Sequence, residues 1–126
     1  MQYNYPKLIR ERSRDLQSIE GQVLEKVLVH VVEPEYNALY LKFPDGWYEA
    51  RGELGSEILG FHKSSAAPIE DNALSESWIG PYKQFEVFIG KKVASTRHIG
   101  NAWNGHGFEI SFEDIQEKTL SFNLFT

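Results

Sequence analysis

Two short segments in which polar and apolar residues alternate constrain this fold more than any other feature. Residues 38–43 read ALYLKF, and residues 108–112 read FEISF. Side chains of a β-strand point alternately to its two faces, so this pattern is typical of strands with one buried face. We therefore expect a mostly antiparallel sheet whose core-facing side chains are Leu39, Leu41, Phe43, Phe108, Ile110 and Phe112. The opposite faces, expected toward solvent or a bound surface, carry Tyr40, Lys42, Glu109 and Ser111.

The residues around these two segments repeat at an offset of 69 positions. Gly21 lies 22 residues before Phe43, and Gly90 lies 22 residues before Phe112. In both halves the glycine precedes a strand with valines, a loop, the alternating strand, an acidic turn residue and a further strand. A short unit that cannot bury its own apolar face packs against its copy. We therefore expect two similar β-rich halves; the alternative is a chance likeness between two short strands.

The chain divides into a helical start and two β-rich halves separated by a loop. Its 126 residues are the size of one domain. Further strands are expected at residues 23–32, 47–54, 57–61, 85–89, 93–99 and 120–125, which are rich in β-branched or alternating residues. The expected parts are a helix within residues 1–20, a first half at 21–62, a polar loop at 63–77 and a second half at 78–126. The predicted fold class is α+β, with the short N-terminal helix packed on a curved antiparallel sheet.

The N-terminal residues follow a helical pattern and are basic. Asn4 suits a cap and Pro6 the first turn, and apolar residues recur at helical spacing: Tyr5, Ile9, Leu16 and Ile19. Residues 1–14 hold four basic and one acidic residue, a balance of +3, whereas residues 15–126 hold nine basic and seventeen acidic residues, a balance of −8. We interpret the arginines as a solvated helix face. Contact with nucleic acid is the alternative, but the acidic bulk of the chain argues against a phosphate-binding protein.

Composition excludes several chemistries. The chain has no cysteine, which rules out disulfides, Cys-ligated zinc, iron–sulfur clusters and a thiol nucleophile. It contains no run of about 20 apolar residues that could span a membrane. The first residues contain no apolar stretch typical of a signal peptide, so we expect a cytoplasmic protein without a membrane partner.

Candidate catalytic residues are few. None of the four histidines forms an H-x-x-x-H or H-E-x-x-H pattern. His98 and His106 are separated by seven residues across a glycine-rich turn, and with Glu109 they could bind a metal or move protons. The alternative is that they are ordinary surface histidines. We expect no catalytic residue, no metal and no cofactor.

The acidic region and one tryptophan predict a binding surface. Residues 33–57 hold six acidic and two basic residues, a local balance of −4. Trp47 and Trp78 are expected to be mainly buried, whereas a tryptophan in the NAWNGHG loop is expected to be exposed and to serve as an anchor. The predicted partner-binding residues are Glu33, Glu35, Glu49, Glu53 and Trp103. The alternative is that these acids only keep the protein soluble.

Two stretches of the chain carry a resemblance. Residues 89–112, IGKKVASTRHIGNAWNGHGFEISF, together with NALYLKFPDGW at 37–47, resemble small bacterial proteins thought to act as immunity proteins against toxins of contact-dependent or polymorphic systems. The resemblance implies a cytoplasmic antiparallel domain that neutralises a toxin by direct binding, and it assigns no functional residue. Many such toxins are nucleases with basic clefts, which an acidic partner complements.

Three classes of function remain open at this point. A protein-binding domain is favoured, with another protein and not nucleic acid as the partner. A small-molecule-binding or regulatory domain would need an apolar cavity lined by Phe and Tyr side chains. A small enzyme, using His98 and His106, would need a pocket where at least two of His62, His98, His106 and the acids converge. The oligomeric state does not follow from the sequence.

Overall fold

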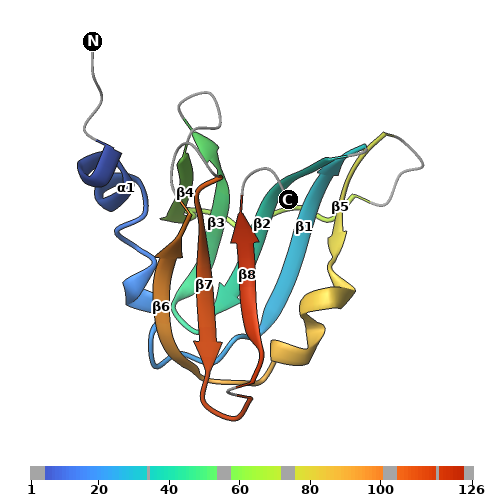
Figure 1. The fold of residues 1–126 in the computed structure, drawn as a ribbon. Coiled ribbons are helices and arrows are strands. Elements are labelled where there is room, and N and C mark those ends of the chain that lie inside the picture. The colour runs from blue at the N-terminus through green and yellow to red at the C-terminus, as the bar shows by residue number, and fades with distance from the viewer. Residues whose placement is uncertain are drawn as a thin grey trace.

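Antiparallel strands dominate the computed structural model, which describes residues 5–33, 35–53, 58–71, 76–100, 105–115 and 117–123. Within these residues there are one α-helix, two 3-10 helices and eight strands in two sheets (Figure 1). Every strand pairing is antiparallel. The predicted α+β class is confirmed, although the strands form two sheets rather than one curved sheet.

The larger sheet has five strands in the order β4-β3-β2-β1-β5. Their bounds are β1 Lys26–Val32, β2 Glu35–Phe43, β3 Gly46–Glu53, β4 Ile58–Lys63 and β5 Ser77–Pro81. β2 and β3 form a tight hairpin in which Phe43 pairs with Gly46. Gly46 has a φ of +136°, a conformation that residues with a Cβ rarely adopt, so the turn requires glycine at this position.

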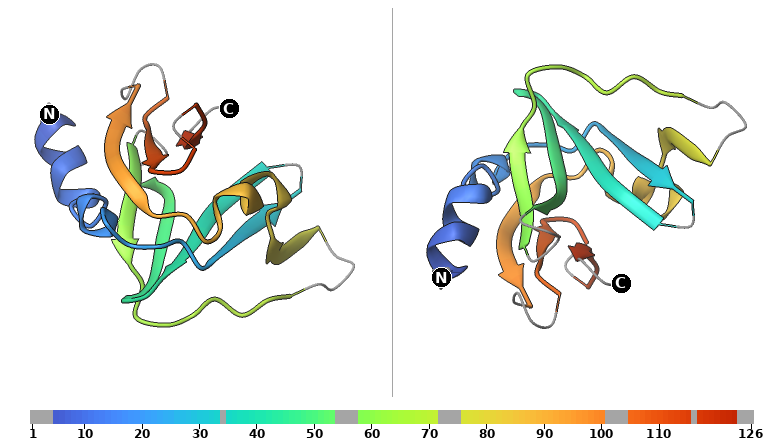
Figure 2. Two further views of the ribbon diagram at one scale, coloured as in Figure 1. Left: turned by 90° about the horizontal axis from the view of Figure 1, so that it is seen from below. Right: turned by 90° about the horizontal axis from the view of Figure 1, so that it is seen from above.

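The smaller sheet has three strands in the order β6-β7-β8: β6 Val93–Ile99, β7 Gly107–Phe112 and β8 Thr119–Asn123. It lies across one face of the five-stranded sheet (Figures 1 and 2). The core between the sheets contains the six side chains predicted from the alternating pattern, all buried. Phe61 of β4 and Phe108 of β7 make an edge-to-face contact at 5.2 Å, which joins the two sheets.

The two halves of the chain form reciprocal backbone hydrogen bonds. The Gly21 N–H donates to the Val93 carbonyl at 2.9 Å, and the Gly90 N–H donates to the Leu24 carbonyl at 2.7 Å. Gly90 and Val93 lie 69 positions after Gly21 and Leu24, so each bond is the counterpart of the other. The two glycines have φ values of +86° and +87°, in the left-handed region that favours glycine.

An approximate two-fold axis therefore relates the halves. Val23 forms an isolated antiparallel bridge with Lys92, its own counterpart at the 69-residue offset, which places the axis beside this pair. Phe43 and Phe112 each end the middle strand of their half, and both are fully buried in the same core. These positions agree with the predicted equivalence of the two phenylalanines.

The repeat extends through one hairpin and then ends. Lys26 pairs with Lys42 in β1–β2, and Ser95 pairs with Ser111 in β6–β7, which is the same register at the same offset. Beyond that hairpin the halves differ, because two residues connect β2 to β3 whereas residues 113–118 connect β7 to β8. β5 also has no strand counterpart, since the residues 69 positions before it lie in the helix α1, Tyr5–Arg12.

One expected element is wrong, and one strand of the structure was not expected. Residues 85–89 are not a strand but belong to the 3-10 helix η2, Lys83–Phe88. Phe85 and Phe88 lie three positions apart and both pack on the core, whereas Val87 and Ile89 are exposed, so the spacing is helical. The strand β5 was not predicted at all.

The N-terminal helix is also shorter than expected. α1 ends at Arg12, and the chain turns before the 3-10 helix η1, Gln17–Ile19. The Ser13 N–H still makes the helical bond to the Ile9 carbonyl, and the Ser13 hydroxyl donates to the same oxygen, a contact that tends to bend a helix. Leu16 and Ile19 are buried, as their spacing predicts. The expected cap Asn4 lies outside the described residues.

The outer face of the five-stranded sheet is covered more than expected. Tyr40 was predicted to face solvent or a partner but is only 7% exposed. It packs in a second apolar cluster with Leu28 and Ala38, against Trp47 and Ile79. Ile79 comes from β5 and Trp47 from β3, so the strands on both sides of the β1–β2 pair help to bury Tyr40. Trp47 and Trp78 are both half-buried rather than mainly buried.

In the described part of the chain, no helix has the length and apolar character needed to cross a membrane.

Candidate functional site

Two of the predicted partner-binding acids lie together at one corner of the larger sheet. Glu33 follows β1 and Glu35 begins β2, and both are exposed. The Glu33 carboxylate accepts a hydrogen bond from the Trp78 indole N–H at 3.2 Å. Glu35 takes part in no ion pair within the described chain.

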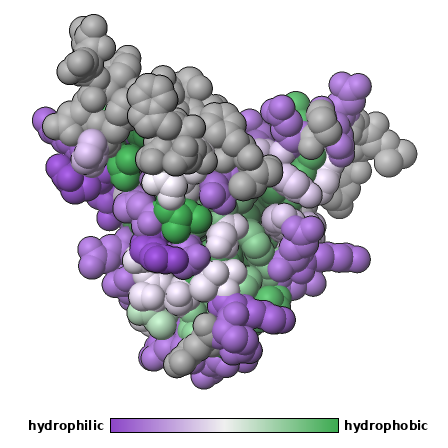
Figure 3. Space-filling model, in the orientation of Figure 1, coloured by the Kyte–Doolittle hydropathy of each residue, from purple (hydrophilic) through white to green (hydrophobic). Residues whose placement is uncertain are grey.

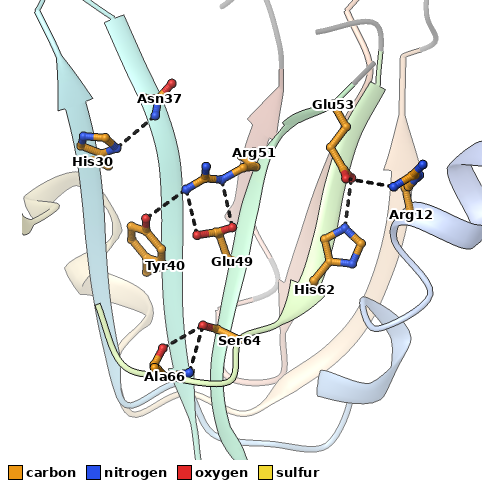
Figure 4. A network of polar contacts seen from close by, with 10 residues as sticks. All are labelled: Arg12, His30, Asn37, Tyr40, Glu49, Arg51, Glu53, His62, Ser64 and Ala66. Atoms are coloured by element: carbon orange, nitrogen blue, oxygen red, sulfur yellow. Dashed lines mark hydrogen bonds and ion pairs between the residues drawn. The ribbon is translucent and has the colours of Figure 1, made fainter. Parts of the chain in front are cut away.

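The other two predicted acids are neutralised within the fold (Figure 4). Glu49 pairs with Arg51 on the same strand, at 2.9 Å. Glu53 lies 3.0 Å from His62 and 3.6 Å from Arg12, which reaches across from α1. The structure therefore divides the predicted acidic surface: of these four acids, Glu33 and Glu35 have no basic partner within the described residues. Trp103 lies outside the described residues.

Exposed apolar side chains adjoin these two acids. Val32 is 43% exposed and Tyr36 is 51% exposed. A register shift between β1 and β2 sets Tyr36 opposite Val31, and its ring stacks on Tyr82 at 5.4 Å. Burial, together with the neighbouring Tyr36, raises the pKa of Tyr82 above its ordinary value. We call this set the corner surface: Val32, Glu33, Glu35, Tyr36, Trp78 and Tyr82.

Apolar surface continues from Tyr82 toward the smaller sheet. Tyr82 contacts Phe85 at 4.7 Å, and both rings, together with Ile115 and Phe122, are only partly buried against the core. Figure 3 shows pale and green surface between the three-stranded sheet and the η2 segment, flanked by hydrophilic side chains. This side of the molecule thus combines accessible aromatic area with a charged border, which is typical of protein-binding surfaces.

His98 and His106 meet, as the sequence allowed. The His98 Nδ1 lies 3.2 Å from the His106 Nε2, and the rings stack at 5.3 Å. His106 is 1% exposed, and burial, with His98 beside it, lowers its pKa to about 4. Desolvation also lowers the pKa of His98. Glu109 does not join them, because it pairs with Arg97 at 2.7 Å.

One backbone group determines where the protons of this pair lie. The Leu59 N–H can only donate, and it donates to the His106 Nδ1 at 2.8 Å. Neutral His106 therefore carries its proton on Nε2 and donates it to the His98 Nδ1. His98 in turn must carry its own proton on Nε2, the nitrogen that faces away from His106.

The exposed side of His98 borders a groove between β6 and the N-terminal segment. The groove encloses about 420 Å³ and is lined by Arg10, Ser13, Arg14, Leu16, Gln17, Thr96 and His98. The sequence pattern indicated only a solvated basic face for these arginines. The groove was missed because residues 10–17 and 96–98 are far apart in the chain, and nothing in their spacing connects them.

Within the described ranges, no group of three or more His, Asp or Glu side chains converges to hold a metal ion. Comparisons with protein-family models, with curated proteins and with solved structures find no match for this chain. A function therefore has to be inferred from the surfaces described above.

Proposed function

We propose that this chain is a non-catalytic protein-binding domain that contacts its partner through the corner surface. The observation that carries the proposal is the juxtaposition of two unneutralised carboxylates, Glu33 and Glu35, with the exposed ring of Tyr36. Aromatic anchors bordered by charged residues are typical of binding hot spots, in which a few side chains supply most of the affinity.

The expected partner is a basic protein. The chain carries a net charge of −5, and the acids of β3 are already paired within the fold, whereas Glu33 and Glu35 have no basic partner within the described residues and can pair with charges of another protein. Complementary charge accelerates association and discriminates against wrong partners. The resemblance to immunity proteins identifies one such partner class, a toxin whose basic cleft the acids would cover.

The histidine pair supports a non-catalytic role. Both ring nitrogens of His106 are engaged inside the protein, by the Leu59 N–H and by His98. His106 cannot exchange a proton with a substrate without breaking one of these bonds, and its pKa of about 4 keeps it neutral near pH 7.

The test measures binding kinetics with a basic protein encoded beside this chain. Glu33→Lys/Glu35→Lys should slow association by roughly tenfold or more, because it reverses the charge that steers the encounter. Tyr36→Ala should mainly speed dissociation. The matched control is Glu113→Lys/Glu117→Lys, which makes the same charge change on the connection between β7 and β8.

Each variant must first melt like the wild type, so that a binding defect is not an unfolding defect. The proposal is contradicted if the corner variants and the control bind with the same rates. Equal slowing by both charge variants would indicate a general effect of net charge and would also exclude the corner as the binding site.

A further inference from the structure

The groove between α1 and β6 is separate from the corner surface and has a different character. Arg10 and Arg14 line it, and neither guanidinium group takes part in an ion pair or hydrogen bond within the described chain. Other cations of the same segment are partnered, since Lys7 lies 3.9 Å from Glu11 and Arg12 lies 3.6 Å from Glu53. Two guanidinium groups that share one groove and have no carboxylate partner can bind an anion there.

The tautomer of His98 adds a hydrogen-bond donor to the groove. Because the His98 Nδ1 accepts the proton of His106, the His98 Nε2 is an N–H group at neutral pH. The buried Leu59 N–H thus determines that this ring offers the groove a donor rather than a lone pair. Such a donor suits an anionic oxygen.

Two acids close to the groove lining in sequence or by contact accept hydrogen bonds within the fold. One oxygen of Glu20 accepts hydrogen bonds from the backbone N–H and the hydroxyl of Thr96, at 2.9 and 3.1 Å. Asp15 accepts a bond from the Lys63 N–H at 2.8 Å. No carboxylate is among the residues that line the groove, so its electrostatic character is basic although the chain as a whole is acidic.

The groove lies where the two halves of the described chain differ. In the first half, β5 pairs along the outer edge of β1. In the second half, β6 is the counterpart of β1, and the residues 69 positions before β5 lie in α1. The groove lies beside β6, between that strand and the N-terminal segment. The counterparts of Arg10 and His98, 69 positions away, are Ile79 and Val29, so the polar residues of the groove are not a consequence of the repeat.

We propose that this groove binds a small molecule carrying a phosphate monoester. Arg10 and Arg14 would each pair with phosphate oxygens, and the His98 Nε2–H would donate to another. A phosphate dianion balances two guanidinium charges, and arginine matches its geometry in two-point contacts. A volume of about 420 Å³ is larger than phosphate needs and lies in the range of small-molecule sites. Nucleic acid is not the expected ligand, because the rest of the surface would repel its backbone.

The experiment titrates the protein with adenosine 5′-monophosphate, inorganic phosphate and adenosine, by calorimetry and by ¹⁵N spectra of the histidine rings. We expect the monophosphate to bind and to shift the His98 Nε2 signal, inorganic phosphate to cause the same shift more weakly, and adenosine to cause none. Arg10→Gln/Arg14→Gln should weaken binding by about tenfold or more. The charge-matched control Lys83→Gln/Lys118→Gln should bind like the wild type; Lys83 is the counterpart of Arg14 in the other half.

Three results would overturn the proposal. One is the absence of any His98 shift with millimolar monophosphate or phosphate. Another is equal loss of affinity in the arginine variant and its control. The third is binding of a short single-stranded RNA, with steep salt dependence, in place of the monophosphate. The corner variants serve as a further control, since they leave the groove intact and should bind the monophosphate normally.

Discussion

His106 couples the stability of the fold to the chemistry of its surface. Its ring is buried between Leu59 of β4 and His98 of β6, with one hydrogen bond to each. A charged His106 would donate from both ring nitrogens and need two acceptors, whereas the fold offers one acceptor, the His98 Nδ1, and one donor, the Leu59 N–H. The neutral ring is therefore part of the folded state, and its protonation must oppose folding.

This predicts a loss of stability in mild acid. The pKa of His106 is about 4 in the folded protein against an ordinary 6.5, so the unfolded chain binds more protons between these values. Neutral His106 contributes roughly 3 kcal/mol to the free energy of unfolding. This contribution is complete above about pH 6.5 and is lost as the pH falls through 4. Urea unfolding at pH 7 and pH 4 measures the loss.

The control for this prediction is His106→Gln, whose amide oxygen can still accept from Leu59 but does not titrate. The wild type should lose more stability than this variant between the two pH values. An identical pH dependence in both proteins would show that His106 does not carry the effect.

At the scale of elements, the reciprocal junction between the halves predicts equal roles for its two glycines. Gly21 and Gly90 share a left-handed conformation, and an added Cβ would meet nothing within 4 Å at either position. Substitution by alanine should therefore cost only backbone strain, about 1–2 kcal/mol at each site. Asparagine tolerates this conformation better and should cost less.

Urea unfolding of Gly21→Ala, Gly90→Ala and the two asparagine variants checks this prediction. The two alanine variants should lose similar amounts of stability. A large cost at one glycine and none at the other would contradict the equivalence of the two junctions.

Elements with one buried face could be predicted from the sequence, because alternation reports directly on burial. This holds for β2 and β7, and for the repeat that relates them. η2 was mistaken for a strand because its apolar residues are dense enough to fit both periods, and only the exposure of Val87 and Ile89 distinguishes them. The sequence of β5 has no alternating pattern that would predict a strand. It is a strand because it pairs with β1, which is distant in sequence.

The candidate site was predictable only in part, for a related reason. Local charge identified Glu33 and Glu35, but the partners of Glu49 and Glu53 are set by side-chain contacts and by the tertiary fold. Arg12 reaches Glu53 from another element. Likewise, two histidines eight positions apart could be expected to meet, whereas the Leu59 N–H that orients them comes from a distant strand.

At the scale of the whole molecule, the departures from two-fold symmetry coincide with the two proposed surfaces. β5 extends the first half and completes the corner surface, whereas α1 takes the equivalent chain position in the second half and forms the groove. One repeated core thus supports two surfaces of opposite charge. The acidic corner suits a basic protein, and the basic groove suits a small anion.

The charge of the molecule predicts how partner binding responds to salt. The screening length falls from about 10 Å at 0.1 M salt to about 3 Å at 1 M. Association with a basic partner should slow severalfold or more over this range, while dissociation changes little. Surface plasmon resonance at several salt concentrations measures both rates. An association rate independent of salt would contradict the proposal that complementary charge accelerates binding of the partner.

The most direct test of the central claim is a hydrogen-exchange footprint of the complex with a basic protein encoded beside this chain. The proposal predicts slowed amide exchange in residues 32–36 and 76–82, which hold the corner surface, and unchanged exchange in residues 10–17 and 96–98 around the groove. Protection confined to the groove, or no protection at the corner in a complex shown to be saturated, would contradict the claim that this domain binds its partner through the corner surface.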